Sequence, residues 1–294
     1  MLRPTQGEPM RNIEIQGHRG ARGLWPENTA EGFRRTAALG VDSIETDVAI
    51  TADGVAVLSH DPHLHPEMAR LGDAWVTAPG PAIAGLTFRD LRRHNVGGLR
   101  HGGALAARFP RQVIFTSAPV PTLAEGLAAS APVVLDVEIK TFPDGRHATA
   151  SPEAMVEAVV AAADKAGARL RLAVRSFDWR GLRHLRRRYP DIPCAVLTSP
   201  DTSNATWWDG IEPGNSVAAT VAAFAGAGAT WAPEWESLDE AAIAEAHRLG
   251  LRVVPWTVND TATMHRLLEW GCDGLCSDEP DVALAVRRAL ISPG

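Results

Sequence analysis

Short runs rich in branched apolar residues alternate with alanine-rich stretches along most of this chain. Such an alternation is typical of parallel α/β architecture, in which a helix follows each strand and packs on the sheet. The predicted strands are 13–17, 42–50, 55–59, 133–140, 170–175, 193–197, 228–232, 252–257 and 274–277. The predicted helices are 29–39, 122–129, 152–166, 178–188, 216–226, 239–248 and 260–269. Asn28, Asp239 and Asp260 are the expected N-caps of three of these helices.

Nine strands exceed by one the number in a (β/α)8 barrel, and the segment 55–59 is the extra strand. Asp53-Gly54 lies between it and the preceding strand and favours a tight hairpin turn. Parallel neighbours need a crossover of about a dozen residues, so 55–59 is expected to be antiparallel. The remaining eight strands predict an α/β fold of the (β/α)8 TIM-barrel type, with an open doubly wound sheet as the alternative.

Residues 61–120 interrupt the alternation and are rich in Pro, Gly and Arg, with one short helix expected near 88–94. A segment of this length is too long for a plain loop, so it predicts a small insertion after the hairpin at the second strand. We expect the insertion to cover part of the barrel mouth. The 294 residues, 45% of them hydrophobic, can bury a large core, and we expect 1–294 to form a single barrel domain.

Composition excludes several classes of partner. The formal charge of −6 leaves no basic excess for binding nucleic acid. The chain shows neither a signal-peptide core nor 18 consecutive apolar residues, so we expect a cytoplasmic protein without stable membrane insertion. Its three cysteines, an odd number, argue against a disulfide framework. The oligomeric state stays open.

Carboxylates gather at the ends of two predicted strands. Glu45 and Asp47 share one face of the second strand, and Asp136, Glu138 and Lys140 share one face of a later strand. Unpaired charges are costly to bury inside a barrel, so a shared cation explains Glu45, Asp47 and Glu138. Oxygen ligands alone favour one Mg²⁺ or Ca²⁺ over zinc. The alternative is a buried salt-bridge network in which Lys140 pairs with a carboxylate.

Two histidines lie near these carboxylates. His18 ends the first predicted strand, and His60 ends the antiparallel arm of the hairpin. Such a pair suits a general base that activates a nucleophile and a general acid that protonates a leaving alkoxide, although the sequence does not assign the two roles. Arg19 and Lys140 suit the non-bridging oxygens of a phosphate.

The turn sets where His60 lies along the hairpin. A two-residue turn would pair His60 with Asp47, and a four-residue turn would pair it with Glu45. Both registers place the imidazole on the carboxylate face, because side chains alternate with a period of two.

Eight short motifs of this chain, in this order between about residues 13 and 285, resemble the glycerophosphodiester phosphodiesterase family. They are His18-Arg19-Gly20, Pro26-Glu27-Asn28-Thr29, Glu45-x-Asp47-Val48, Thr51-x-Asp53-Gly54, His60-Asp61, Glu138-Ile139-Lys140, Ser176-Phe177 and Trp256-Thr257-Val258-Asn259. The resemblance implies a (β/α)8 barrel with an insertion after His60-Asp61. It also implies hydrolysis of a small-molecule glycerophosphodiester substrate to sn-glycerol 3-phosphate and an alcohol.

By position, the resemblance also assigns roles to individual residues. The implied catalytic pair is His18 and His60, the implied metal ligands are Glu45, Asp47 and Glu138, the implied phosphate contacts are Arg19 and Lys140, and Trp256 would flank the glycerol end. The implied cofactor is a divalent cation, Mg²⁺ or Ca²⁺, at one site. The segment that follows His60-Asp61 departs from the commoner family pattern, which leaves the preferred alcohol open.

Two other functions remain as alternatives. One is a lysophospholipase D-type release of the head group from lysophospholipids. The other is a barrel that binds a phosphodiester without turning it over. The reaction path is also open, since direct attack by water and a cyclic phosphate intermediate need the same groups. Trp231, at a strand end, is a secondary candidate for substrate contact.

Overall fold

Eight parallel strands form the centre of the computed structural model, which describes residues 12–291. They are hydrogen-bonded in the order β11–β10–β9–β8–β7–β2–β1–β12. Their bounds are β1 Glu14–Gly17, β2 Ser43–Ile50, β7 Val134–Ile139, β8 Leu172–Ser176, β9 Cys194–Thr198, β10 Thr230–Pro233, β11 Arg252–Val253 and β12 Gly274–Ser277. Backbone hydrogen bonds from Asp273 N to Val253 O (2.8 Å) and from Cys276 N to Pro255 O (2.9 Å) join the two ends of this row. The barrel predicted from the sequence is confirmed.

The seventh strand of the barrel is shorter than predicted. β11 ends at Val253, whereas the sequence predicted a strand over 252–257. Pro255 has no N–H to donate and therefore interrupts a regular ladder. Its carbonyl still accepts the bond from Cys276, so the barrel closes here without a continuous strand.

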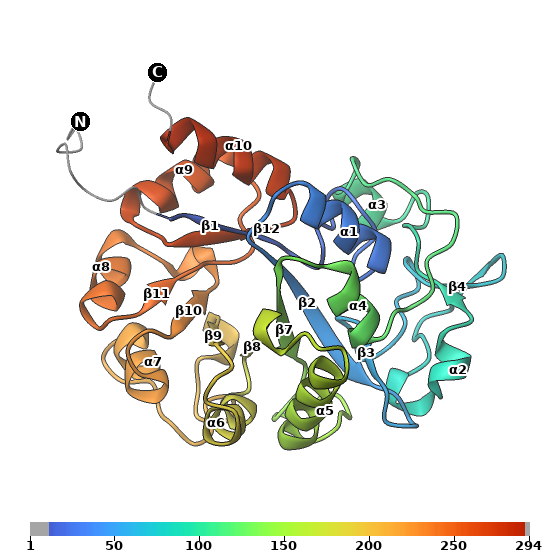
Figure 1. Cartoon of the computed structure of the whole chain (residues 1–294), viewed down its shortest axis with the longest axis horizontal. Helices are drawn as coiled ribbons and strands as arrows, with labels where there is room; N and C mark the ends of the chain where they lie inside the picture. Colours follow the sequence, from blue (N-terminus) through green and yellow to red (C-terminus); the bar gives the residue numbers. More distant parts are fainter. Residues whose placement is uncertain (1–11, 292–294) are drawn as a thin grey trace.

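Helices surround the barrel, as Figure 1 shows. Their bounds are α1 Ala30–Ala38, α4 Leu123–Ala129, α5 Pro152–Lys165, α6 Trp179–Arg188, α7 Val217–Ala225, α8 Glu240–Arg248, α9 Thr261–Trp270 and α10 Pro280–Ile291. The predicted caps Asp239 and Asp260 are confirmed, since each side chain accepts a backbone hydrogen bond at its helix start. The prediction for Asn28 is wrong, because Thr29 caps α1 and accepts from Gly32 N. The last helix, α10, was absent from the prediction.

The hairpin and the insertion lie at one side of the barrel. β3 (Ala56–Leu58) runs antiparallel to β2, as predicted. The insertion then contributes β4 (Arg70–Leu71), β5 (Ala74–Trp75), η1 (Ile83–Gly85), α2 (Phe88–Leu91), β6 (His94–Asn95) and α3 (Ala104–Arg108). Its three strands form a small antiparallel sheet that the sequence did not predict, because two-residue strands carry no periodic pattern.

The insertion packs on the hairpin through a small apolar cluster of its own. This cluster contains Val57, Leu64, Ala69, Ile83, Leu91 and Val120. Val57 belongs to β3, so the cluster attaches the insertion to the hairpin arm that leads to His60. In Figure 1 the labelled elements α2 and β4 lie beside β3, at the edge of the ring of helices.

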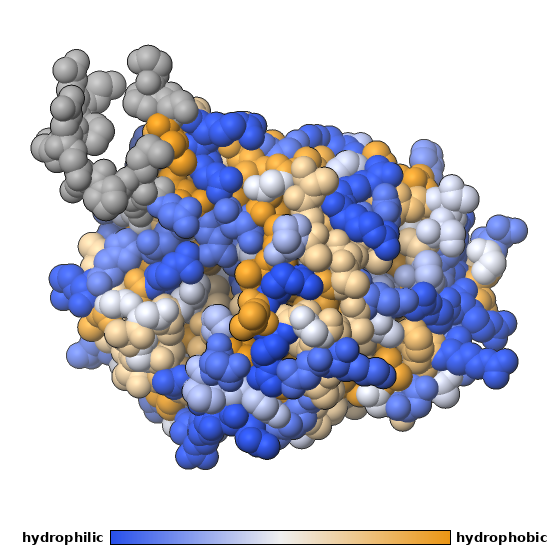
Figure 2. All heavy atoms as spheres, viewed as in Figure 1, coloured by the Kyte–Doolittle hydropathy of each residue, from blue (hydrophilic) through white to orange (hydrophobic). Residues whose placement is uncertain are grey.

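The surface and the helix lengths bear on the predictions about membrane insertion, cellular location and domain organisation. Figure 2 shows hydrophilic side chains over much of one face, with apolar residues scattered between them. Within residues 12–291 the helices are too short or too polar to cross a bilayer. The cytoplasmic location stays a prediction. So does the single-domain organisation over 1–294, because 1–11 and 292–294 lie outside the described residues.

Candidate active site

The predicted site residues meet at the carboxyl ends of β1, β2 and β7. A pocket of about 880 Å³ is lined by all of them except Asp47, namely His18, Arg19, Glu45, His60, Glu138, Lys140 and Trp256. Asp47 lies behind this lining with 1% of its surface exposed, and it forms ion pairs with Arg19 and Lys140. The fold thus brings all of the predicted residues into one site.

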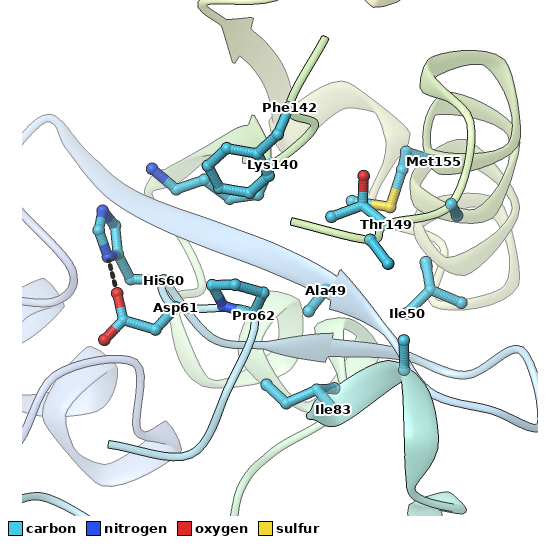
Figure 3. A pocket seen from close by; sticks show the side chains of 13 residues that line it. Ala49, Ile50, His60, Asp61, Pro62, Ile83, Lys140, Phe142, Thr149 and Met155 are labelled. Carbon is cyan, nitrogen blue, oxygen red and sulfur yellow. Dashed lines mark hydrogen bonds and ion pairs between the residues drawn. The ribbon is translucent and has the colours of Figure 1, made fainter. Parts of the chain in front are cut away.

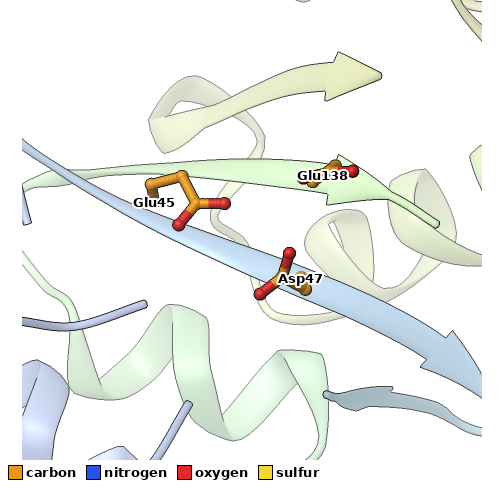
Figure 4. A group of neighbouring side chains, drawn as sticks. All are labelled: Glu45, Asp47 and Glu138. Carbon is orange, nitrogen blue, oxygen red and sulfur yellow. The ribbon is translucent and has the colours of Figure 1, made fainter. Parts of the chain in front are cut away.

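Three carboxylates project from two neighbouring strands. Glu45 and Asp47 lie on the same face of β2, and the β2–β7 register places Glu138 beside Asp47. Figure 4 shows the Glu45 and Asp47 side chains on β2 and Glu138 on β7. One oxygen from each residue lies within 4.8 Å of the others. Such spacing suits three oxygen ligands of a single hard cation.

Burial and mutual repulsion both act against the ionised form of these carboxylates. Burial and the Asp47 carboxylate raise the pKa of Glu45 to about 8. Burial also raises the pKa of Glu138, against the effect of Lys140. For Asp47 burial acts in the same direction, but Lys140 and other basic neighbours hold its pKa well below the usual range. A divalent cation among these groups would stabilise all three in the ionised form.

Lys140 forms part of the salt-bridge network that the sequence offered as an alternative. Its Nζ lies 2.7 Å from Glu138 Oε1 and 3.2 Å from Asp47 Oδ1. Asp47 Oδ1 is nevertheless buried without a hydrogen bond among the described residues. The backbone N–H of Arg19 donates a hydrogen bond to Glu45 Oε2 (2.9 Å). An oxygen with an ion pair but no hydrogen bond, in an all-oxygen donor set, can still bind a hard cation, so the salt bridge and a cation site are compatible.

His18 is held by a carboxylate from the far end of the chain. Its Nδ1 lies 2.5 Å from Asp278 Oδ1, and its Nε2 lies 3.8 Å from Glu45 Oε2. Burial lowers the pKa of His18 to about 4, although Asp278 acts in the opposite direction. The imidazole is therefore neutral near pH 7. With Nδ1–H donating to Asp278, the lone pair is on Nε2 and faces the carboxylate cluster.

His60 lies beyond the hairpin, and both predicted registers of that hairpin are wrong. Ile50 pairs with Ala56, so five residues form the turn, and continued pairing would set His60 opposite Thr46. Strand β3 ends at Leu58, however, and after one more backbone bond from Ser59 N to Asp47 O (3.0 Å) the chain leaves the ladder, so His60 reaches the pocket from the loop that follows. Proximity therefore comes from the path of the loop and not from alternation along the strand.

The imidazole of His60 is paired with its neighbour in sequence. Its Nδ1 lies 2.7 Å from Asp61 Oδ1. About a third of the His60 side chain is exposed (33%), whereas only 10% of the His18 side chain is. Burial, Lys140 and Arg19 lower the pKa of His60. Figure 3 shows the Lys140 ammonium and the His60 ring at the same end of a second, smaller pocket.

Arg19 lies in a turn that depends on glycine. Arg19 and Gly20 both have left-handed backbones, with φ of 51° and 76°. A Cβ on Gly20 would come within 2.4 Å of the Phe33 ring, so the position requires glycine. The turn sets the Arg19 guanidinium 3.0 Å from Glu27 Oε1 and 3.4 Å from Asp47 Oδ2. It also aims the Arg19 backbone N–H at the cluster.

An aromatic wall closes the other side of the pocket. The rings of Phe177 and Trp256 meet edge to face at 5.4 Å, above a floor of small apolar side chains. Trp256 Nε1 donates to Ala232 O (2.9 Å), which fixes the indole. Glu234 and Trp235 line the pocket next to this wall. The pocket therefore has a charged half and an aromatic half.

Several residues that support the site were missed from the sequence. Asn28, expected to cap a helix, donates from Nδ2 to Asp47 Oδ2 (3.1 Å) and accepts from Thr46 Oγ1 (2.7 Å). Glu27 holds Arg19, and Asp278 holds His18. The sequence could have indicated Glu27 and Asn28, because both belong to one of the eight motifs that resemble the family. For Asp278 the only indication was its position, one residue after the last strand.

Trp231, the secondary candidate, has no place in this pocket. It is 3% exposed, and its Nε1 donates to Thr198 Oγ1 (2.8 Å). It packs in the apolar core, so the expectation that it contacts substrate is not supported by its position.

Comparisons with known proteins show what this chain is similar to. A sequence model of the glycerophosphoryl diester phosphodiesterase family matches residues 18–282. A "Glycerophosphodiester phosphodiesterase" of Bacillus subtilis is 27% identical over 92% of this chain and 85% of its own length. A human "Glycerophosphoinositol inositolphosphodiesterase" is 34% identical, but over 42% of this chain and 24% of its own length.

Solved structures are similar over nearly the whole chain. A crystal structure from Silicibacter pomeroyi, of a protein provisionally named a glycerophosphoryl diester phosphodiesterase, has a TM-score of 0.87 at 35% identity. The match covers 96% of this chain and 95% of that one. An Oleispira antarctica phosphodiesterase in complex with the product sn-glycerol-3-phosphate has a TM-score of 0.68 at 19% identity and covers 93% and 96%. At that identity the likeness concerns the fold alone.

Proposed function

The chain belongs to the glycerophosphoryl diester phosphodiesterase family, and from this premise we propose that it hydrolyses glycerophosphodiesters to sn-glycerol 3-phosphate and an alcohol. The observation that supports the proposal best is the meeting of two His–Asp pairs and three buried carboxylates at one pocket. In the overall reaction water supplies the hydroxyl that remains on phosphorus. The bond between phosphorus and the alcohol oxygen breaks, and that oxygen leaves with a proton.

His18 is proposed as the general base and His60 as the general acid. The neutral state of His18 and the free lone pair on its Nε2 suit it to accept the proton of the nucleophile. His60, which lies beside Lys140 at the edge of the pocket, would give its proton to the departing alcohol oxygen. Asp278 and Asp61 act as positioning residues, because each holds the Nδ1 of one imidazole.

Arg19 and Lys140 are proposed to bind the non-bridging oxygens of the phosphate. Both line the charged half of the pocket. Each is paired with a carboxylate, and an incoming phosphate could bind the same guanidinium or ammonium group beside that carboxylate. Trp256 is proposed to flank the glycerol end, with the Phe177 ring beside it. An apolar wall of this kind packs on the carbon skeleton of glycerol while the charged half holds the phosphate.

Glu45, Asp47 and Glu138 are proposed to hold one divalent cation, Mg²⁺ or Ca²⁺. When bound, the cation would supply positive charge and Lewis acidity toward the anionic phosphate. The chain itself holds the three carboxylates close together, through Lys140, Asn28 and the Arg19 backbone.

The test is release of sn-glycerol 3-phosphate from glycerophosphocholine by protein stripped with EDTA, with Mg²⁺, Ca²⁺ or Mn²⁺ added back singly. We expect activity to return with Mg²⁺ or Ca²⁺. Release that is equal with and without added cation would contradict the metal site. Absence of release with every cation would reject the proposed activity on this substrate. Lysophosphatidylcholine would then test the head-group-releasing alternative, and binding without turnover would identify the non-catalytic barrel.

A further inference from the structure

Glu234 lies across the barrel mouth from the carboxylate cluster. It follows β10, and the strand order separates β10 from β2 by β9, β8 and β7 on one side and by β11, β12 and β1 on the other. The pocket of about 880 Å³ is lined by Glu45 at the end with the cluster and by Glu234 on the opposite side. A ligand that binds Arg19 and Lys140 through its phosphate and crosses the pocket therefore meets Glu234.

The backbone fixes Glu234 beside the aromatic wall. Glu234 and Trp256 are paired residues of two parallel segments. Trp256 N donates to Pro233 O (3.1 Å), and Trp235 N donates to Trp256 O (3.0 Å). Residues paired in this way present their side chains on the same face of a sheet. The carboxylate and the indole therefore belong to one end of the pocket, where Leu197 adds apolar surface.

The Glu234 carboxylate is free to accept hydrogen bonds from a ligand. Among the described residues it has neither a hydrogen bond nor an ion pair, whereas Glu45 accepts from the Arg19 backbone. Burial and the neighbouring Glu236 raise the pKa of Glu234, as expected for an acidic group without a basic partner. A partly buried acceptor beside an indole suits a ligand that offers hydroxyl groups on a short carbon skeleton.

The two sides of the pocket match the two ends of a glycerol 3-phosphate unit. Its phosphate is on carbon 3, so the hydroxyl on carbon 1 is farthest from the phosphate-binding groups Arg19 and Lys140. We infer that Glu234 accepts a hydrogen bond from this hydroxyl and selects deacylated glycerophosphodiesters over lysophospholipids. An ester or ether at carbon 1 offers only acceptors to the carboxylate, so the hydrogen bond is lost. The inference rests on the proposed function, in which the glycerol end lies against Trp256.

The experiment compares choline esters that differ only at carbon 1, with the cation that restores activity. They are glycerophosphocholine, its 1-deoxy analogue and its 1-O-methyl ether. Because the leaving alcohol is the same in each, the rate of choline release reports on the retained glycerol end alone. We expect kcat/KM to be about 10- to 100-fold lower for the deoxy and methyl compounds, the ratio typical of one hydrogen bond to a charged group. This comparison uses the wild-type protein and so does not depend on the folding of a variant.

Glu234→Ala tests whether this carboxylate is the group that discriminates. It should lower kcat/KM for glycerophosphocholine about 10- to 100-fold and leave that for the 1-deoxy analogue unchanged, so that the two substrates become equal. Glu234→Gln keeps an acceptor without the charge and should retain part of the ratio between them. Glu236→Ala is the matched control, because Glu236 is exposed, lines the same pocket and carries the same charge two residues later. It should keep the full ratio.

The outcomes separate the inference from the function on which it rests. Equal cleavage of the three esters by the wild-type protein, a ratio that persists in Glu234→Ala, or an equal loss in Glu236→Ala would overturn the role of Glu234 while the hydrolase remains. The 3,3-dimethylbutyl ester, which has the shape of the choline ester without its charge, tests whether Glu234 binds the leaving alcohol instead. A loss in Glu234→Ala that is confined to the choline ester would overturn the inference in that way. Absence of hydrolysis with every ester would reject the proposed function and the inference with it.

Discussion

His18 and His60 each hold a carboxylate at Nδ1, but the two pairs are built differently. His18 meets Asp278, 260 positions away in sequence, and these side chains are 10% and 1% exposed. His60 meets Asp61, the next residue, and these side chains are 33% and 43% exposed. One pair joins the first and last strands of the barrel, and the other lies in a loop outside the ladder.

The difference extends to the neighbours of each carboxylate. Asp278 also accepts from Arg22 Nε (2.6 Å) and from Asn259 Nδ2 (2.8 Å), so three groups fix its position. For Asp61 the structure gives a side-chain bond to His60. The barrel therefore holds His18 through several contacts, whereas His60 is more exposed and its carboxylate has fewer partners.

The largest expected effect comes from removing either imidazole. His18→Ala and His60→Ala should each lower kcat for glycerophosphocholine on the order of 10²–10⁴-fold, because each removes one proton-transfer group. The two variants should differ on the p-nitrophenyl ester, whose leaving group departs without a proton. There the defect of His60→Ala should shrink and that of His18→Ala should persist. Steady-state kcat on both substrates measures this.

Circular dichroism and cation binding serve as controls that both variants are folded with an intact carboxylate cluster. Equal defects of the two variants on both esters would show that the proposed division into base and acid is wrong. A reversed pattern would exchange the two roles.

The next effect concerns stability. Asp278→Asn removes the nearer of the two carboxylates that pair with the buried Arg22 guanidinium and leaves Glu27 at 3.6 Å, which should cost on the order of 1–3 kcal/mol of unfolding free energy. It should also lower kcat, because the amide can present either a donor or an acceptor to His18 Nδ1. Urea unfolding together with kcat checks both. Wild-type stability in this variant would mean that Asp278 does not hold the barrel pair as described.

A bound cation should increase the difference in local stability between the strands β2 and β7 and the loop that carries His60. Its proposed ligands belong to β2 and β7, so Mg²⁺ or Ca²⁺ at about 100 times Kd should stabilise the protein by about 2.7 kcal/mol. Hydrogen exchange should slow in β2 and β7 more than in the loop 59–65. Glu138→Ala should remove the gain, whereas Glu212→Ala, at an exposed position away from the site, should keep it. Equal protection of the loop would contradict the proposed separation.

The smallest effect is expected at the exposed pair. Asp61→Asn should change the unfolding free energy by less than about 1 kcal/mol, because the ion pair is open to solvent. Its effect on kcat should be smaller than that of Asp278→Asn, since Asp61 is more exposed than Asp278 and solvent can replace its contact with His60. Side-by-side urea and kinetic measurements of the two Asp→Asn variants provide the comparison. A larger loss of stability in Asp61→Asn would reverse our account of which pair is structural.

The carboxylate cluster was the part of the site most accessible from sequence. Glu45 and Asp47 alternate along one strand, and Glu138 alternates with Lys140 along another, so local periodicity placed each pair on one face. The parallel pairing of β2 with β7 then places Glu138 beside Asp47 and completes the cluster. Asn28 shows the limit of this reasoning. Its position before a helix predicted a cap, yet a left-handed backbone (φ 53°) turns it toward Asp47.

The turn of the hairpin could not be deduced from Asp53-Gly54 alone. Val55 N donates to Thr51 Oγ1 (3.0 Å), and Gly54 N donates to Thr51 O (2.9 Å), which closes a five-residue turn. One residue more or less in a turn moves every later side chain to the other face of the strand. The prediction that His60 reaches the carboxylates was therefore right for a different physical reason.

By itself the sequence determined the strand–helix alternation, the hairpin, the carboxylate faces and the residues able to carry acid–base and phosphate-binding chemistry. These follow from short-range periodicity and from side-chain chemistry, which are properties of neighbouring residues. The tertiary structure decided the pairing of His18 with Asp278, the role of Asn28 and the path of the loop that brings His60 to the pocket. Each depends on contacts between distant segments that exist only once the barrel closes and the insertion packs on the hairpin.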